Sequence, residues 1–252
     1  MPARPEPNGS EPTGSGPNGS DPNGSDIVPG TLLSHLHPDA RASLLAAGVR
    51  RRFDSGETLL HQGDPTDHVL VLRSGWVRVS ATTTDGQAVL LALRGPGDVL
   101  GELAALHGWP RTATVRALEP VVVAQFRAPV FLEVLHRQPA VAVALLKQLS
   151  TRLRDAERAR VDSATLDVAH RVAAHVLRLA EQHGEAEGRV IVVRMPLTQQ
   201  DIADQIGASR RAVARALGTL RERRVVTTGR RLITVHQPDV LRAFTASAPN
   251  GT

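Results

Sequence analysis

One stretch near the C-terminus, Thr198–Leu220, reads TQQDIADQIGASRRAVARALGTL. Thr198 is a good N-cap for a short helix, Gly207 is a typical helix end, and Ser209 can cap a second helix that runs to Glu222. Both expected helices place apolar residues three or four positions apart, so each has one face to bury. These inward-facing residues are Ile202, Ala203, Ile206, Val213, Leu217 and Leu220. A short helix, a tight turn and a longer helix form a helix-turn-helix.

The charge of this region indicates its partner. Residues 225–235 predict a two-stranded hairpin, or wing, and between Thr198 and Arg231 eight arginines accompany three acids, a net charge of +5 that equals the formal net charge of the whole chain. A solvated basic helix would not explain the helix-turn-helix spacing. We therefore expect binding to duplex DNA. The expected DNA-binding residues are Thr198, Gln199, Gln200, Ser209, Arg210, Arg211, Arg215, Arg230 and Arg231.

A long helix is expected upstream, over residues 139–164, because Pro139 is tolerated in a first turn. Its apolar positions alternate by four and three residues, as in a coiled-coil seam. They are Ala142, Leu146, Leu149, Leu153 and Ala156, followed by Arg160. Packing against the chain's own core would use one face of such a helix, and we expect the rest to pair two copies into a homodimer.

The region from residue 27 to residue 138 has a different sequence pattern. Short β-branched runs at residues 68–72, 76–82, 88–93, 114–117 and 121–126 alternate with glycine-bearing turns. Many short strands with frequent turns predict a small β-roll. We therefore expect an α+β chain with a roll at 27–138, a central dimerisation helix at 139–164 and a winged helix-turn-helix domain at 165–245. Residues 1–26, rich in Pro, Gly, Asn and Ser, predict a disordered arm, and residues 246–252 a flexible tail.

Composition excludes several classes of site and protein. The chain has no Cys, so disulfides, Cys-ligated zinc, iron–sulfur clusters and a catalytic thiol are excluded. The N-terminus lacks the apolar stretch of a secretory signal and no segment approaches the roughly 18 apolar residues of a membrane span, so we expect a cytoplasmic protein without a membrane partner. Aromatic residues make up only 2% of the chain, which argues against stacking of single-stranded nucleic acid.

A second informative stretch, residues 97–115, reads GDVLGELAALHGWPRTATV. A glycine before a short helix, Glu102 in its first turn and Arg111 nine residues later can build a cradle for a phosphate. Arg111 would pair with the anion and Glu102 would take ribose hydroxyls. The alternative is a plain surface ion pair between Glu102 and Arg111.

Gly101-Glu102-Leu103-Ala104, followed by Arg111-Thr112-Ala113-Thr114-Val115, resembles the phosphate-binding cassette of cyclic-nucleotide-binding domains. Together with the helix-turn-helix, residues 27–245 resemble the Crp/Fnr superfamily of bacterial transcription regulators. The resemblance implies a sensor roll with cyclic AMP as the first candidate effector, a partly palindromic operator, contacts with RNA polymerase, and base contacts from Arg210 and Arg215. The implied ligand-binding residues are Leu100, Gly101, Glu102, Leu103, Ala104, Arg111, Thr112, Ala113, Ala156 and Glu157, with Glu102 on the ribose 2′-OH and Arg111 and Thr112 on the cyclic phosphate.

The chain departs from that family pattern at three places. It lacks the N-terminal cysteines of the family's oxygen sensors, so an iron–sulfur switch is excluded. Ala156-Glu157 replaces the Thr-Ser pair that receives adenine in cyclic-AMP-responsive members, which leaves the identity of the base open. Arg211 replaces a Glu of the recognition helix, so the half-site should differ there, because Arg prefers guanine O6 and N7.

Two other functions are compatible with parts of the sequence. One is a constitutive or other-ligand-responsive DNA-binding regulator with a degenerate pocket. The other is an enzyme, a cupin-like metalloenzyme, with a haem-based sensor as a further variant. Because His35 and His37 precede the first expected strand and the remaining candidates, His61, His68 and His107, are scattered over turns, we expect no metal, no covalent cofactor and no catalytic residue.

Overall fold

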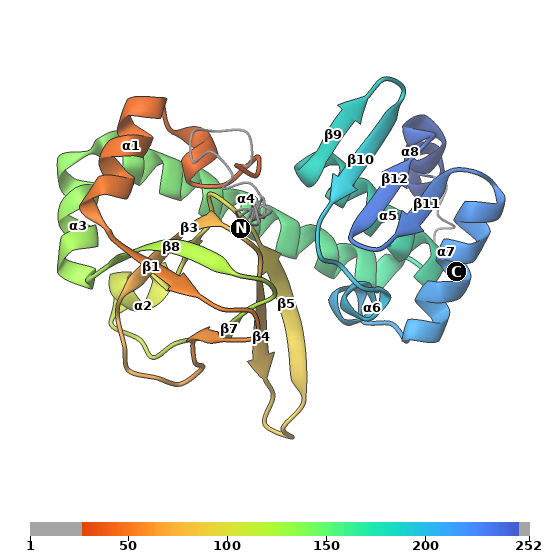
Figure 1. Cartoon of the computed structure of the whole chain (residues 1–252). Helices are drawn as coiled ribbons and strands as arrows, with labels where there is room; N and C mark the ends of the chain where they lie inside the picture. Colours follow the sequence, from red (N-terminus) through yellow and green to blue (C-terminus); the bar gives the residue numbers. More distant parts are fainter. Residues whose placement is uncertain (1–26, 247–252) are drawn as a thin grey trace, which may run out of the picture.

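The computed structural model describes residues 27–246. It has the expected α+β architecture, with an N-terminal β-roll, the long helix α4 (Pro139–Thr165), and a C-terminal domain that holds the helix-turn-helix and a small sheet (Figure 1). The arm expected at residues 1–26 and residues 247–252 of the expected tail lie outside the described residues.

The β-roll consists of two four-stranded antiparallel sheets, in the orders β1-β8-β3-β6 and β2-β7-β4-β5. The strands are β1 (Val49–Phe53), β2 (Thr58–Leu60), β3 (Val69–Ser74), β4 (Val77–Thr82), β5 (Ala88–Arg94), β6 (Val99–Leu100), β7 (Thr114–Ala117) and β8 (Val121–Phe126). The five expected strands are confirmed with their ends shifted by two residues at most, and three further strands were not expected. β1 reads VRRRF and is almost fully exposed, while β2 and β6 have only three and two residues, so none carries a periodic apolar signal.

Helices cover the roll at its edges. The short helix η1 (Leu33–His35), α1 (Pro38–Ala47) and α3 (Ala128–Arg137) pack with α4 around one buried cluster that includes Phe126 and Phe131. Helix α2 (Glu102–His107) lies within the roll and follows β6 directly. α4 then leads from the roll to the C-terminal domain (Figure 1).

The C-terminal domain begins with α5 (Val168–His183), whose N-cap Asp167 accepts a hydrogen bond from the His170 amide. Its sheet has the order β11-β12-β10-β9. The remaining elements are β9 (Gly184–Glu187), β10 (Val190–Arg194), α6 (Gln199–Ile206), α7 (Arg210–Glu222), β11 (Val226–Gly229), β12 (Leu232–Val235) and α8 (Pro238–Ala246).

α4 covers the helix expected at residues 139–164 and ends one residue later, at Thr165, before the chain leaves the helix at Leu166. β9 follows α5 and pairs with β10, and this strand was not expected from the sequence. Backbone hydrogen bonds to a neighbouring strand can hold polar residues in a strand. The polar sequence of β9 therefore does not predict one.

Among the described residues, no single helix is long and apolar enough to cross a membrane. The consecutive helices α3 and α4 meet the length and composition criteria only as a pair that is bent by 108°.

Candidate effector pocket and DNA-binding face

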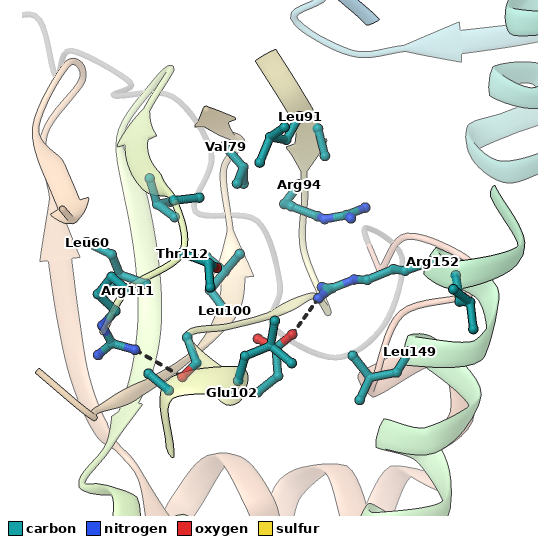
Figure 2. Close-up of a pocket in the computed structure, with 17 residues that line it drawn as sticks. Leu60, Val79, Leu91, Arg94, Leu100, Glu102, Arg111, Thr112, Leu149 and Arg152 are labelled. Carbon is teal, nitrogen blue, oxygen red and sulfur yellow. Dashed lines mark hydrogen bonds and ion pairs between the residues drawn. The ribbon is translucent and has the colours of Figure 1, made fainter. Parts of the chain in front are cut away.

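A cavity of about 350 Å³ opens between the roll, α2 and α4 (Figure 2). Eight of the ten expected ligand-binding residues line it together: Leu100, Gly101, Glu102, Leu103, Ala104, Arg111, Thr112 and Ala113. The wall is completed by residues that the sequence did not single out as ligand contacts: Leu60, Val79, Leu91, Ala92, Arg94, Val115, Leu149, Arg152 and Leu153. Residues from distant parts of the chain thus form a single cavity large enough for a small-molecule ligand.

Gly101 connects β6 to α2 in a left-handed conformation, with φ of +77°. A Cβ atom at this position would collide with Nη1 of Arg111 and lie 3.0 Å from the carbonyl oxygen of His68. Both the backbone angle and the close approach of Arg111 therefore require glycine here.

Arg111 is held firmly beside this glycine. Only 4% of the residue is exposed. Its Nη1 donates to the Gly101 carbonyl at 3.0 Å, its Nη2 to the His68 carbonyl at 2.6 Å, and its Nε to the Thr66 hydroxyl at 3.0 Å. Because a guanidinium has five N–H groups, two of them remain for a ligand. Burial lowers the pKa of Arg111, while the nearby carboxylates of Asp67, Asp64 and Glu102 act in the opposite direction.

Glu102 faces the same cavity and is 4% exposed. Its Oε1 accepts a hydrogen bond at 2.9 Å from Nη1 of Arg152, which projects from α4 (Figure 2). The partner of Glu102 is therefore Arg152, and the surface ion pair with Arg111 that sequence left as an alternative does not form. Arg152 also donates to Asp98 at 3.0 Å and to the Val99 carbonyl at 2.7 Å. These bonds join α4 to the strand that leads into the cradle.

Ala156 and Glu157 lie apart from the other expected ligand residues. Ala156 lines a second cavity of about 240 Å³ between β5, α4, α5 and α6, and Glu157 is exposed and lines neither cavity. The α4 side chains that reach the cavity of Glu102 and Arg111 are Leu149, Arg152 and Leu153, about one helical turn earlier.

The DNA-reading unit is built by local capping, as expected. The Thr198 hydroxyl accepts from the Asp201 amide at 3.1 Å while the Asp201 carboxylate accepts from the Thr198 amide at 2.8 Å, which is a complete capping box. Gly207 ends α6 in the left-handed region, and the Ser209 hydroxyl accepts from the Ala212 amide at 3.2 Å to cap α7.

The unit turns its arginines outward. α7 buries Val213, Ala216, Leu217 and Leu220 against the domain, which leaves its opposite face to solvent. The residues expected to bind DNA that are exposed are Thr198, Gln200, Ser209, Arg210, Arg211, Arg215, Arg230 and Arg231, and Gln199 is half-buried. This arrangement presents donors from the start of α7 and from the wing, where contacts to base edges and phosphates are made in winged helix-turn-helix proteins.

The wing and α6 also contact the β-roll. Arg231, at the wing tip with φ of +59°, pairs with Glu119 in the turn between β7 and β8. Arg78 of β4 pairs with Asp201 and, at 3.1 Å, with Asp204 of α6. Leu90 and Leu93 of β5 belong to the same buried cluster as the core of the C-terminal domain. The reading unit is thus docked on the sensor roll.

Histidines do not gather into a metal site. Within residues 27–246, no group of three or more His, Cys, Asp or Glu side chains is placed to hold a metal ion.

Known proteins share both halves of the chain. Residues 50–138 match the cyclic nucleotide-binding domain and residues 170–244 match the Crp-like helix-turn-helix domain. The "CRP-like cAMP-activated global transcriptional regulator" of Mycobacterium tuberculosis is 32% identical over 188 residues, which cover 75% of this chain and 84% of the relative. The "Global nitrogen regulator" of Nostoc sp. is 30% identical over 200 residues, 78% of this chain and 90% of the relative.

Solved structures share the fold. FixK2 from Bradyrhizobium japonicum superposes with a TM-score of 0.68 at 22% identity, covering 80% of this chain and 98% of that one. A CooA mutant from Carboxydothermus hydrogenoformans gives a TM-score of 0.69 at 18% identity, covering 81% and 90%. At these identities the likeness concerns the fold alone.

Proposed function

This chain belongs to the Crp/Fnr family of transcription regulators, and on that premise we propose that a cyclic nucleotide bound in its β-roll controls the affinity of a homodimer for operator DNA. Its relatives are transcription regulators rather than enzymes, and the chain itself is a DNA-binding regulator with an effector-binding domain. Beyond this, we propose that the effector is a cyclic nucleotide, that the chain forms a homodimer, and that nucleotide binding changes the affinity of the dimer for DNA.

One observation carries the proposal: Glu102, Arg111 and Arg152 meet at a single cavity although they come from α2, the following loop and α4. Arg111 keeps two N–H groups for a cyclic phosphate, and Glu102 keeps an oxygen for a ribose hydroxyl. The name of the Mycobacterium tuberculosis relative, together with the family resemblance, makes cyclic AMP the first candidate.

The same contacts supply a route from the pocket to the DNA-binding domain. A ribose hydroxyl on the free oxygen of Glu102 would bind the same carboxylate that holds Arg152, which anchors α4 to the roll. α4 continues to the Leu166 junction and then to α5 of the DNA-binding domain. A ligand that binds more tightly to one position of α4 therefore shifts the orientation of the reading unit. Binding of equal strength to both positions would shift nothing.

The support for a homodimer is the exposed apolar face of α4. Val143, Leu146, Leu153 and Val161 are each at least half exposed, which is unusual for four large apolar residues on one helix. Leu146 and Leu153 belong to the seam expected from the sequence and Val143 and Val161 flank it, so pairing with a second copy would bury all four. Two-fold symmetry then implies a partly palindromic duplex with half-sites about one helical turn apart. Such a regulator acts in the cytoplasm together with RNA polymerase.

The deciding experiment combines calorimetry with DNA binding. Cyclic AMP and cyclic GMP are titrated into the wild type, into Arg111→Ala and into a control, Arg127→Ala, whose exposed side chain lies outside the cavity. Operator affinity is then measured by fluorescence anisotropy with and without nucleotide. We expect heat of binding and a gain in DNA affinity for the wild type and the control, and neither for Arg111→Ala.

A negative result has a definite meaning. A wild type that gives no heat and no thermal shift with either nucleotide rejects this proposal in favour of a regulator that is constitutive or responds to another ligand.

A further inference from the structure

Arg94, the last residue of β5, has an unusual position in the molecule. It borders the cavity of Glu102 and Arg111 and also two neighbouring cavities of about 240 and 190 Å³. Its side chain is only partly exposed, yet within residues 27–246 the guanidinium forms no hydrogen bond and no ion pair. Because its nitrogens are not fully buried, the guanidinium can meet a ligand that supplies the acceptors the protein does not.

The carboxylates near Arg94 are engaged elsewhere. Asp98 accepts hydrogen bonds from Arg152 at 3.0 Å, from Gln148 and from the Gly95 amide at 3.1 Å. Glu102 accepts from Arg152, and Asp155 accepts from Gln182 at 2.7 Å. Their charges reach Arg94 only at longer range.

Electrostatics shows that Arg94 remains a cation. Burial, followed by the positive charge of Arg152, lowers the pKa of Arg94 to about 10, while Asp98, Glu102 and Asp155 act in the opposite direction. The side chain is therefore protonated at neutral pH. Arg152 lies on the same side of the cavity, but its Nη1 and Nη2 are bonded to Glu102, Asp98 and Val99, so Arg94 is the arginine on this side whose guanidinium has no acceptor among the described residues. The cavity is lined by three arginines and one carboxylate.

The two ends of the cavity carry different side chains for contact with a ligand. Figure 2 shows Arg111 and Thr112 on one side and Arg94 and Arg152 on the other, with the Arg94 side chain extending from β5 towards α4. A nucleotide whose phosphate lies at Arg111 therefore places its base between β5 and α4, beside the unpaired donors. Leu91, Leu149 and Leu153 supply apolar wall at the same end.

Of adenine and guanine, only guanine has an O6/N7 edge that presents acceptors alone to such donors. Guanine offers O6 and N7 to the fork of an arginine, whereas adenine pairs its N7 acceptor with an N6 amino donor that opposes a guanidinium. We propose that Arg94 reads the base of the effector and selects guanine over adenine, so that the chain responds to cyclic GMP in preference to cyclic AMP. This inference rests on the proposed cyclic-nucleotide pocket and replaces its first candidate for the base.

The test is a calorimetric comparison of cyclic GMP and cyclic AMP on the full chain. Wild type is compared with Arg94→Met, which keeps an unbranched apolar stem, with Arg94→Lys, which keeps the charge without the fork, and with Arg127→Met as an exposed control. We expect the wild type and the control to bind cyclic GMP about tenfold or more tightly, in line with the discrimination of a bidentate contact. Arg94→Met should bind the two nucleotides within about threefold of each other, and Arg94→Lys should lose most of the preference.

The outcomes separate this inference from the function on which it rests. A wild type that binds both nucleotides equally, or cyclic AMP more tightly, overturns the role of Arg94 and leaves the cyclic-nucleotide pocket standing. A preference for cyclic GMP that survives in both Arg94→Met and Arg94→Lys overturns it as well. If the wild type binds neither nucleotide, both proposals fall. Thermal unfolding of each variant verifies that it is folded, and because Arg94→Lys retains the charge, it keeps the test decisive if Arg94→Met does not fold.

Discussion

Nη2 of Arg78 on β4 lies 3.1 Å from Oδ2 of Asp204 on α6, and the same guanidinium also pairs with Asp201. The sensor roll therefore holds the first helix of the DNA-reading unit by two acidic side chains, one in its first turn and one in its second. Asp201 is at the same time the residue that closes the capping box of α6 with Thr198. One carboxylate thus serves both the local helix start and the contact between domains.

Replacing Arg78 with Met should reduce the stability of this arrangement. The Asp201 side chain is only 5% exposed, so the variant leaves a buried carboxylate without its cation while the hydrogen bonds from Thr198 remain. We expect the free energy of unfolding to fall by about 1–3 kcal/mol, measured by urea denaturation. A matched change at an exposed ion pair, Arg137→Met, should cost less than about 1 kcal/mol. Equal losses would show that the Arg78 contact is not formed in solution.

Glu119→Gln should strengthen binding to DNA. The carboxylate pairs with Arg231, which we expect to contact a phosphate, so it competes with DNA for that side chain. Removing its charge should raise the affinity about two- to fivefold, as expected for a partly exposed ion pair. The gain should be the same on operator and random duplexes and smaller at high salt. An unchanged or lower affinity in anisotropy titrations would contradict the competition.

The two groups of exposed arginines should act differently. Arg215→Ala on α7 should cost about 1–3 kcal/mol on the operator and relax specificity at one base pair, whereas Arg230→Ala in the wing should weaken all sequences to a similar extent. Titrations against an operator, single-base variants and random DNA measure this difference. If both changes reduce specific and random binding equally, α7 is not the helix that reads bases.

Dimerisation should depend on the exposed seam of α4. Leu146 is 63% exposed and faces away from the roll, so Leu146→Glu should leave the monomer folded and place a charge in the expected interface. We expect the wild type to sediment as a dimer at micromolar concentration and the variant as a monomer. Glu133→Gln on α3, also exposed, is the control. A monomeric wild type, with and without nucleotide, would reject the homodimer.

Acid should destabilise the protein through a buried histidine. Burial, and next the charges of Arg178 and His183, lower the pKa of His175 from 6.5 to about 3. Above about pH 7 both folded and unfolded chains carry the neutral ring, so there is no effect. As the pH falls from 6.5 towards 3, the unfolded chain binds a proton that the folded chain does not, and stability decreases.

For this one group, the loss between pH 7 and pH 5 should be about 2 kcal/mol. His175→Gln should therefore make the fall in unfolding free energy shallower over that range, and the exposed control His37→Gln should not. Urea denaturation at the two pH values measures the difference, and parallel slopes for wild type and His175→Gln would contradict it.

Local sequence determined the elements whose signals are short-ranged. The caps at Thr198 and Ser209 and the glycine at 207 define α6 and α7, since each acts within a few residues of the helix end that it stabilises. β7 and β8 match their expected ranges because their apolar runs are bounded by turns. For the same reason Gly101, Glu102 and Arg111 could be expected to meet, as Arg111 is only nine positions after Glu102.

Tertiary structure decided what depends on distant partners. β1 exists because β8 supplies its hydrogen bonds, although its own sequence is VRRRF. Arg152 reaches Glu102, and Ala156 faces a different cavity, because packing against the roll fixes the rotation of α4, whereas the seam of a helix only shows which residues share a face. The charge of Arg94 is left unpaired for a similar reason, since Arg152, 58 positions further along the chain, takes the nearby carboxylates. The sequence by itself determined which residues are able to form the site. The tertiary structure decided which of these side chains share the same hydrogen-bond and ion-pair partners, because they compete for a partner only when folding brings them close together.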